Sequence, residues 1–252
     1  MDLQVQGTGP SAPFLSARDL FETERDLQLP VYVRLREDPD VRTWAAHYED
    51  HHVLNISKQA ANSVMARELA LHEFAHMARY EEAHPSHTQS MAEVLYLALS
   101  GRQVERHRLA HCYQIANHMK DIYADDITLT VGPGEKLLAF LESSLAASLR
   151  DRPGQPPSVT AAEHVPQGSD PSITAVNAAF ALALGERHDL LEADHQLYDL
   201  ARTAAADAPG IDFDTFCSQF RELAHDPDPS SYRQQLVDTT RSYVVATARA
   251  AD

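Results

Sequence analysis

The chain has 252 residues, of which 44% are apolar, so it can bury the core of one sizeable domain, alone or with a smaller appendage. Its 37 acidic residues against 21 basic ones give a net charge of −16, which disfavours nucleic acid as a partner because phosphates require a basic surface. Only three of the basic residues are lysines, and aspartate outnumbers glutamate. This composition favours a halophilic protein over an ordinary acidic one, because concentrated salt screens the repulsion within such a surface.

The sequence gives no indication of export or membrane insertion. Its first residues lack the basic segment and apolar segment of a signal peptide. The longest mostly apolar run, residues 175–184, is too short to span a bilayer. Cys112 and Cys217 are too few for a disulfide framework, and we expect two buried thiols. We therefore expect a soluble, cytoplasmic protein with no membrane partner.

The N-terminal part predicts a small β element. Residues 1–28 are polar and irregular in pattern, and residues 31–36 then alternate between apolar and polar side chains. A turn is expected at residues 38–40, followed by two further short extended segments at 43–48 and 51–56.

Helical patterns dominate the rest of the chain. Ser57 is the expected N-cap of a helix that ends before Pro85, and further helices are expected over 86–101, 103–127 and 135–150. The segment 151–171 is rich in proline and predicts a loop or linker. Residues 172–252 again show helical periodicity. We predict a mostly α (α+β) protein with a domain over 1–150, a linker over 151–171 and a helical C-terminal region over 172–252.

The first expected helix contains His-Glu-Phe-Ala-His at residues 72–76. Side chains four residues apart lie one above the other on a helix, so His72 and His76 can bind one tetrahedral metal ion such as Zn²⁺. Glu73 is then placed to act as the general base on a metal-bound water. Fourteen histidines make a chance match conceivable. The alternative is a pair of core histidines bonded to backbone carbonyls, with Glu73 at the surface. However, both histidines continue a stripe from Met65 and Leu69 that predicts burial.

A third ligand is expected from the helix over 103–127. Asp121 and Asp125 lie one turn apart, so one can bind the metal while the other accepts a hydrogen bond from the free N–H of a ligand histidine. Asp121 is the preferred ligand, and Asp125 is the second-shell residue or alternative ligand. If this helix face instead meets water, both aspartates are solvated and have no catalytic role.

Together, these residues resemble the zincin metallopeptidases. More narrowly, HEFAHMARYEEAHPSHTQS followed by QIANHMKDIYADDITL is similar to an uncharacterised HExxH family of halophilic archaea. The resemblance covers about residues 45–130 and implies a zincin-like helical core. Related metallopeptidases pair HExxH with a later Asn-x-x-x-Asp, which corresponds here to Asn117 and Asp121 and supports Asp121 as the ligand. Such enzymes align an extended peptide along an edge strand, for which residues 51–56 are the candidate.

Further candidates come from residues on the neighbouring predicted helices. Glu93 on the next helix is an alternative metal ligand of the gluzincin type, but Leu97 stands where such proteins carry an acid. Asn117, His118 and Tyr123 are candidates for the cleft.

The function expected from these patterns is that of a zinc-dependent metallopeptidase acting on a peptide or protein substrate, with a zinc-bound water activated by Glu73. Two alternatives stay open. One keeps the metal without proteolysis, as a metallohydrolase acting on a small amide or as an inactive zincin whose metal braces the fold. The other is a metal-free helical interaction protein.

Overall fold

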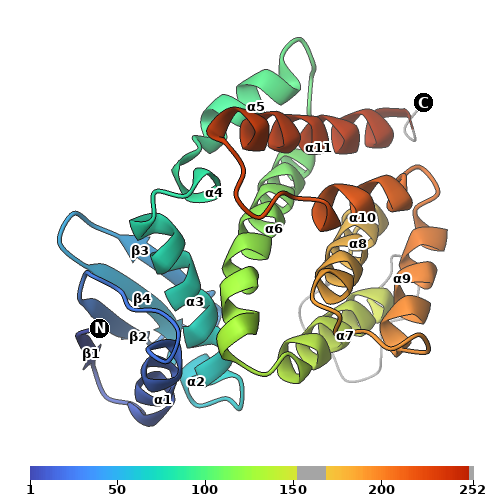
Figure 1. The fold of residues 1–252 in the computed structure, drawn as a ribbon. Coiled ribbons are helices and arrows are strands. Elements are labelled where there is room, and N and C mark those ends of the chain that lie inside the picture. The colour runs from blue at the N-terminus through green and yellow to red at the C-terminus, as the bar shows by residue number, and fades with distance from the viewer. Residues whose placement is uncertain (152–168, 250–252) are drawn as a thin grey trace. The chain divides into compact units, whose positions relative to one another are not determined.

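The computed structural model describes residues 1–151 and 169–249 (Figure 1). It is 62% helical with one four-stranded sheet near the N-terminus, which confirms the predicted mostly α (α+β) fold class. Among the described residues, no helix is long and apolar enough to cross a membrane. The two cysteines are buried free thiols, as expected.

Packing divides the chain into two units. The first comprises residues 1–89 and 120–136, and the second comprises residues 90–119 and the chain from 137 onward. Residues 90–119 and 137–150 pack within the second unit. Most of the expected linker lies outside the described residues, so the predicted division into 1–150 and 172–252 stays a prediction.

The first unit is built on a mixed sheet with the strand order β1-β2-β4-β3. β1 is parallel to β2 and β2 to β4, whereas β3 is antiparallel to β4. Their bounds are Leu3–Gln6 for β1, Val31–Arg36 for β2, Trp44–His47 for β3 and His52–Ser57 for β4. Two expectations were wrong here. Residues 1–28 contain strand β1 and helix α1 (Ala12–Phe21), and residues 52–56 of the candidate edge strand belong to the internal strand β4, so β3 is the edge strand on that side.

Helix α3 (Ala66–Glu81) carries the HExxH motif and packs against α1 and β3. Phe74 on α3 meets Phe21 on α1 edge to face, with 6.0 Å between the ring centroids. The predicted single helix from Ser57 is interrupted after α2 (Lys58–Ala61). The reason is local: the side chains of Asn62 and Ser63 donate hydrogen bonds to backbone carbonyls of α2 and compete with helix continuation.

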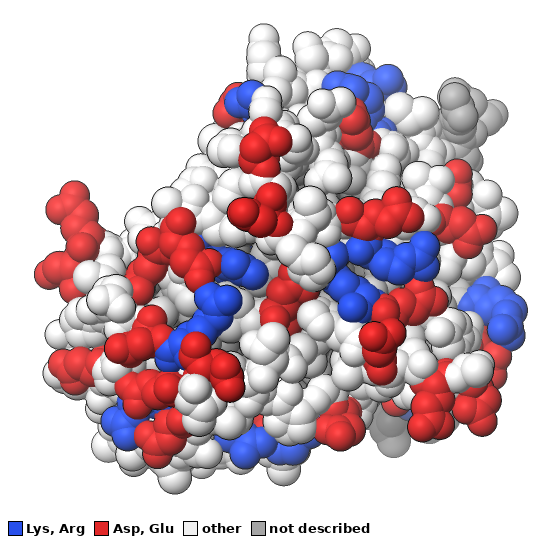
Figure 2. All heavy atoms as spheres, in the orientation of Figure 1, with Lys and Arg blue, Asp and Glu red and all other residues white. Residues whose placement is uncertain are grey.

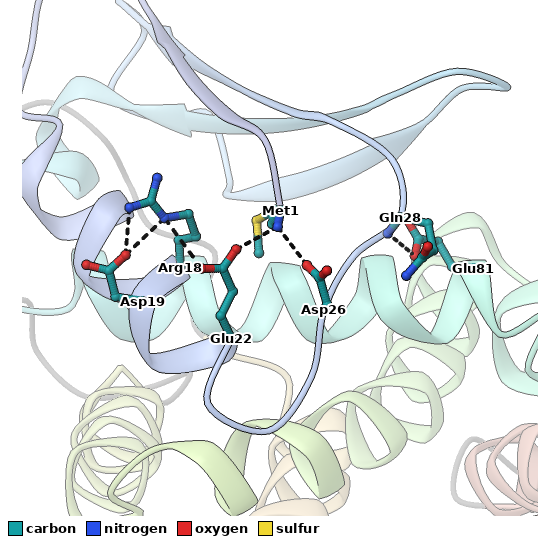
Figure 3. A network of polar contacts seen from close by, with 7 residues as sticks. All are labelled: Met1, Arg18, Asp19, Glu22, Asp26, Gln28 and Glu81. Atoms are coloured by element: carbon teal, nitrogen blue, oxygen red, sulfur yellow. Dashed lines mark hydrogen bonds and ion pairs between the residues drawn. The ribbon is translucent and has the colours of Figure 1, made fainter.

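Polar contacts fix the end of α3 next to the N-terminal segments. The carboxylate of Glu81 accepts hydrogen bonds from the backbone N–H groups of Gln28 and Leu29, at 2.8 and 2.9 Å. Figure 3 shows the Gln28 contact together with the Met1 ammonium group, which lies between Glu22 and Asp26. The Glu81 contacts hold the end of α3, and with it the motif helix, next to the segment that leads into β2.

The remaining helices of the described chain follow the predicted pattern with two changes. The expected helix over 86–101 is divided into a short α4 and α5 because Ser90 caps α5 by accepting a hydrogen bond from the backbone N–H of Glu93. Residues 188–195 are not helical, and His195 caps α9. The bounds are Pro85–Thr88 for α4, Met91–Leu99 for α5, Arg106–Val131 for α6, Glu135–Arg150 for α7, Pro171–Arg187 for α8, Gln196–Asp207 for α9, Phe213–Arg221 for α10 and Pro229–Arg249 for α11.

The core of the second unit lies around α8. This helix is buried on nearly all sides and packs against α9 and α10, while α11 packs against α5. Helix α6 contributes to both units: residues 106–119 count with the second and residues 120–131 with the first. An apolar stripe of α6 is buried, at Cys112, Ile115, Met119 and Ile122.

Candidate metal centre

The two motif histidines face each other on α3. The Nε2 atoms of His72 and His76 are 3.0 Å apart, and the rings are nearly perpendicular. Both side chains are only partly buried, with 26% and 12% of their surface exposed. The predicted stripe is therefore the partly open edge of α3 rather than its buried face, which leaves the histidines accessible.

Asp121, from the part of α6 that packs in the first unit, completes the group. Its Oδ1 lies 3.3 Å from Nε2 of His76 and 3.8 Å from Nε2 of His72. Within the described residues, these three are the one group of at least three histidine, cysteine or acidic side chains whose ligand atoms all lie within 4.8 Å of one another. They could therefore hold a metal ion.

The separations of the three ligand atoms fit a small tetrahedral cation. Ligands at about 2.0–2.1 Å from such an ion lie about 3.3 Å from one another. The observed separations of 3.0, 3.3 and 3.8 Å bracket that value. Two imidazoles and one carboxylate are also a donor set that borderline transition metals accept.

Asp125, one turn after Asp121, holds the first histidine. Its Oδ1 lies 2.8 Å from Nδ1 of His72, and its side chain is only 3% exposed. An ionised carboxylate only accepts hydrogen bonds, so Nδ1 of His72 carries the proton. The Nε2 atom of His72 is then directed at His76, where the two nitrogens can share one proton or bind one cation.

His87 holds the second histidine from α4. Its Nε2 lies 2.8 Å from Nδ1 of His76, on the side of the ring that faces away from His72. Both motif histidines are thus anchored through Nδ1 and present Nε2 to the same point. The alternative of core histidines bonded to backbone carbonyls does not describe this arrangement, and Glu73 is buried rather than at the surface.

The electrostatics of the site are dominated by burial and the carboxylates. Burial by itself lowers the pKa of His72, but Asp125, Asp121 and Glu73 outweigh it and raise that pKa to about 10. Burial, aided by the neighbouring His76 and Lys120, lowers the pKa of His87 far below its ordinary value, so this imidazole is neutral.

Comparison with known families gives one match, which covers most of the chain. A family model described as a family of unknown function (DUF5781) matches residues 1–245. The chain belongs to this family. No curated protein and no solved structure gave a significant match. The DUF5781 match spans all three residues of the triad and most of the second unit.

Several other predicted residues of this DUF5781 chain have different partners. Glu93 pairs with Arg233 within the second unit, at 3.2 Å, and is not part of the metal-binding group. Asn117 is exposed. His118 also belongs to the second unit, where its Nε2 lies 2.8 Å from Oδ1 of Asn177 and its ring stacks on Phe180.

Tyr123 lies in the first unit but is not an open cleft residue. Its side chain is fully buried, and its ring packs against His84 with 4.6 Å between centroids. Its backbone carbonyl accepts a hydrogen bond from Nε of Arg79 at 2.9 Å. Tyr123 therefore helps to join α6 to α3.

Two residues near the triad were not singled out from the sequence. Lys120 is partly buried; burial lowers its pKa, while the nearby Asp121 and Glu73 raise it. His47 on the edge strand β3 stacks on Tyr80 of α3, with 4.2 Å between the rings. Burial lowers the pKa of His47 to about 4, and the charges of His52, Lys120 and His76 act in the same direction. A lysine adjacent to Asp121 was the only sequence signal for this positive group.

Proposed function

We propose that the chain is a zinc-dependent metallopeptidase of the zincin type. The observation that carries the proposal is the convergence of His72, His76 and Asp121 on one point, next to the buried Glu73. Three protein ligands leave one coordination position open, as in catalytic rather than structural zinc sites. The resemblance of residues 45–130 to zincin metallopeptidases supports the same reading.

We infer zinc from the donor set. Two histidines and one carboxylate are typical of hydrolytic zinc centres, and both histidines are held in the orientation that a metal ligand needs. When bound there, Zn²⁺ would lower the pKa of a coordinated water and polarise a substrate carbonyl.

Glu73 is the proposed general base. It follows His72 directly on α3 and is 7% exposed, and its charge acts on both His72 and Lys120. Its carboxylate would take a proton from the attacking water and later deliver it to the leaving amine of the peptide. No other described carboxylate combines burial with a place between the two histidines in sequence.

The substrate we propose is an extended peptide added to the edge of β3. Among the described strands, none pairs with the outer side of β3, so its backbone groups can bind another strand. The aromatic side chains of Trp44, Tyr48 and Tyr80 are exposed near this edge and could contact the substrate side chains. β3 packs against α3, which carries two of the three triad residues, so this edge lies near the triad.

We further propose that the protein works in a salt-rich cytoplasm. The face shown in Figure 2 carries acidic side chains across much of its surface, in keeping with the net charge of −16. Two buried free thiols agree with a reducing compartment. Assays of the protein should therefore be run in concentrated salt.

The decisive test compares the Glu73→Gln variant with the wild type. We expect the variant to keep one zinc ion per chain and to lose about 10²–10⁴-fold in the rate of cleavage of quenched-fluorescent peptides. Glu82→Gln, with the same chemical change just after α3, is the matched control and should retain the wild-type rate. Wild-type activity in Glu73→Gln would exclude Glu73 as the base. Zinc binding without any wild-type cleavage would indicate a metal that braces the fold or serves another reaction.

A further inference from the structure

A chain of four hydrogen-bonded side chains leads away from the metal centre. His76 Nδ1 contacts His87 Nε2 at 2.8 Å, and His87 Nδ1 contacts Ser86 Oγ at 2.7 Å. Ser86 Oγ in turn contacts His84 Nδ1, also at 2.7 Å. Ser86 and His84 are buried, at 3% and 6% exposure. The protons along this series of hydrogen bonds can be arranged in two directions. Only one of them leaves Nε2 of His76 without a proton, as a metal ligand requires.

The direction of this chain is set by a backbone group. The N–H of Ser86 donates to Nδ1 of His84 at 3.2 Å, as the capping contact of α4. A backbone N–H can only donate, so Nδ1 of His84 is an acceptor and carries no proton. The His84 proton is therefore on Nε2.

The remaining protons follow from this anchor. Because Nδ1 of His84 accepts, the single hydroxyl proton of Ser86 must also be donated to it. Oγ of Ser86 then accepts the N–H at Nδ1 of His87. A neutral His87 has no second proton, so its Nε2 accepts from Nδ1–H of His76. The lone pair of His76 is left on Nε2, which faces His72 and Asp121.

We propose that Ser86 is a positioning residue which, through His87, fixes His76 in the tautomer that binds the metal. This inference rests on the proposed zinc site. Asp125 supports Nδ1 of His72, and His87 with Ser86 supports Nδ1 of His76 in the same way, with neutral side chains in place of a carboxylate. His76 is thereby oriented without a further negative charge next to Asp121 and Asp125.

The proposal predicts a specific failure in Ser86→Ala. Without the hydroxyl, His87 has no acceptor for a proton on Nδ1 and can carry it on Nε2 instead. It then donates to Nδ1 of His76, whose own proton moves to Nε2 and blocks the metal position. We expect zinc affinity, measured by chelator competition, to fall about 10–100-fold. Ser86→Thr keeps the hydroxyl and should restore most of the affinity.

The experiment combines zinc titration with long-range ¹H–¹⁵N spectra of metal-free protein labelled at histidine. In the wild type we expect His76 and His87 to carry their protons on Nδ1, and in Ser86→Ala we expect His87 to change tautomer. Ser63→Ala, which lies outside this series of hydrogen bonds, controls for the loss of a serine. Single His→Gln variants assign the signals. Circular dichroism confirms that each variant is folded.

The outcomes separate this inference from the proposed function. A wild-type His87 with its proton on Nε2 would overturn the inference, as would wild-type zinc affinity in Ser86→Ala or a wild type that binds no zinc. If the tautomers and the loss of affinity are found but no peptide is cleaved, the inference stands and the peptidase proposal fails.

Discussion

Two pairs of histidines in this chain have the same spacing and different surroundings. His72 and His76 lie four residues apart on α3 in the first unit, with Nε2 atoms 3.0 Å from each other. His107 and His111 lie four residues apart on α6 in the second unit, with 5.7 Å between ring centroids. His111 contacts the hydroxyl of Tyr243 at 2.6 Å, and His107 is 55% exposed beside Glu105.

The comparison shows that spacing alone does not make a metal site. In the first pair, each Nδ1 has a partner that turns Nε2 toward a shared point, and a carboxylate lies within 4 Å of both. In the second pair, both Nδ1 atoms also have partners, Tyr243 at His111 and Glu105 at His107, but the described residues include no third ligand within reach. A third ligand within reach of both histidines therefore distinguishes the first pair from the second.

The largest expected effect comes from removing one histidine of each pair. His76→Ala should lower zinc affinity more than 100-fold because it leaves only two protein ligands. His111→Ala, the matched change in the second pair, should bind zinc as the wild type does. Metal analysis after chelator competition measures both. An equal loss of zinc affinity in the two variants would show that the first pair is not a metal site distinct from the second.

Removing the charge behind the first pair should have a smaller effect. Asp125→Asn keeps an oxygen near His72 but loses the carboxylate, so zinc affinity should fall about 10–100-fold. Glu105→Gln, which removes the carboxylate next to His107, is the control and should leave the zinc affinity unchanged. If Asp125→Asn abolished zinc binding and Asp121→Asn did not, Asp125 rather than Asp121 would be the ligand.

Part of the acid sensitivity near the first pair should come from His47. Its folded pKa of about 4 lies below the unfolded value of 6.5, so between these pH values the unfolded chain binds a proton that the folded chain excludes. Stability is complete above pH 6.5 and falls as the pH drops toward 4, with a contribution on the order of 2 kcal/mol from this group. His47→Gln should lose less stability over this window. Urea unfolding followed by the fluorescence of Trp44, the single tryptophan, measures the difference.

The smallest expected effect lies in the second pair. Tyr243→Phe removes the hydrogen bond to His111 and should lower the free energy of unfolding by about 1 kcal/mol. Zinc affinity should be unaffected. Urea unfolding followed by circular dichroism gives the stability, and a change in zinc binding would contradict the separation of the two pairs.

Much of the fold follows from local patterns. The alternation at residues 31–36, the apolar stripe of α6 and the bounds of α7 at Glu135–Arg150 agree with the structure. The predicted helix from Ser57 was wrong where side chains compete with the backbone for hydrogen bonds, as at Asn62 and Ser63. The prediction of irregular structure over residues 1–28 was also wrong, because this polar segment contains a short strand and a helix that is stabilised by packing against α3.

The triad could be predicted because helical spacing determines which side chains meet. HExxH places His72 and His76 one turn apart on one face of α3. Asp121 and Asp125 are likewise one turn apart on α6, so the two carboxylates can reach different atoms of the site. The support from His87 could not be predicted, because it depends on the turn from α3 into α4. Ala83 adopts a φ of 51° in this turn, a left-handed conformation that an alanine does not predict. Glu93 and His118 show the converse, since their actual partners are distant in sequence, at Arg233 and Asn177.

The discontinuity of the first unit determines when its centre can form. His72 and Asp125 are 53 residues apart, and the segment between them includes residues 90–119 of the second unit. During synthesis on the ribosome, both histidines emerge well before either aspartate, so a metal ion that meets the nascent chain finds an incomplete site. A fragment ending at residue 89 would retain the whole HExxH motif and still lack its carboxylate ligand. If the triad binds a metal as proposed, capture of the ion would be a late event, because the site is complete only when the second half of α6 packs in the first unit.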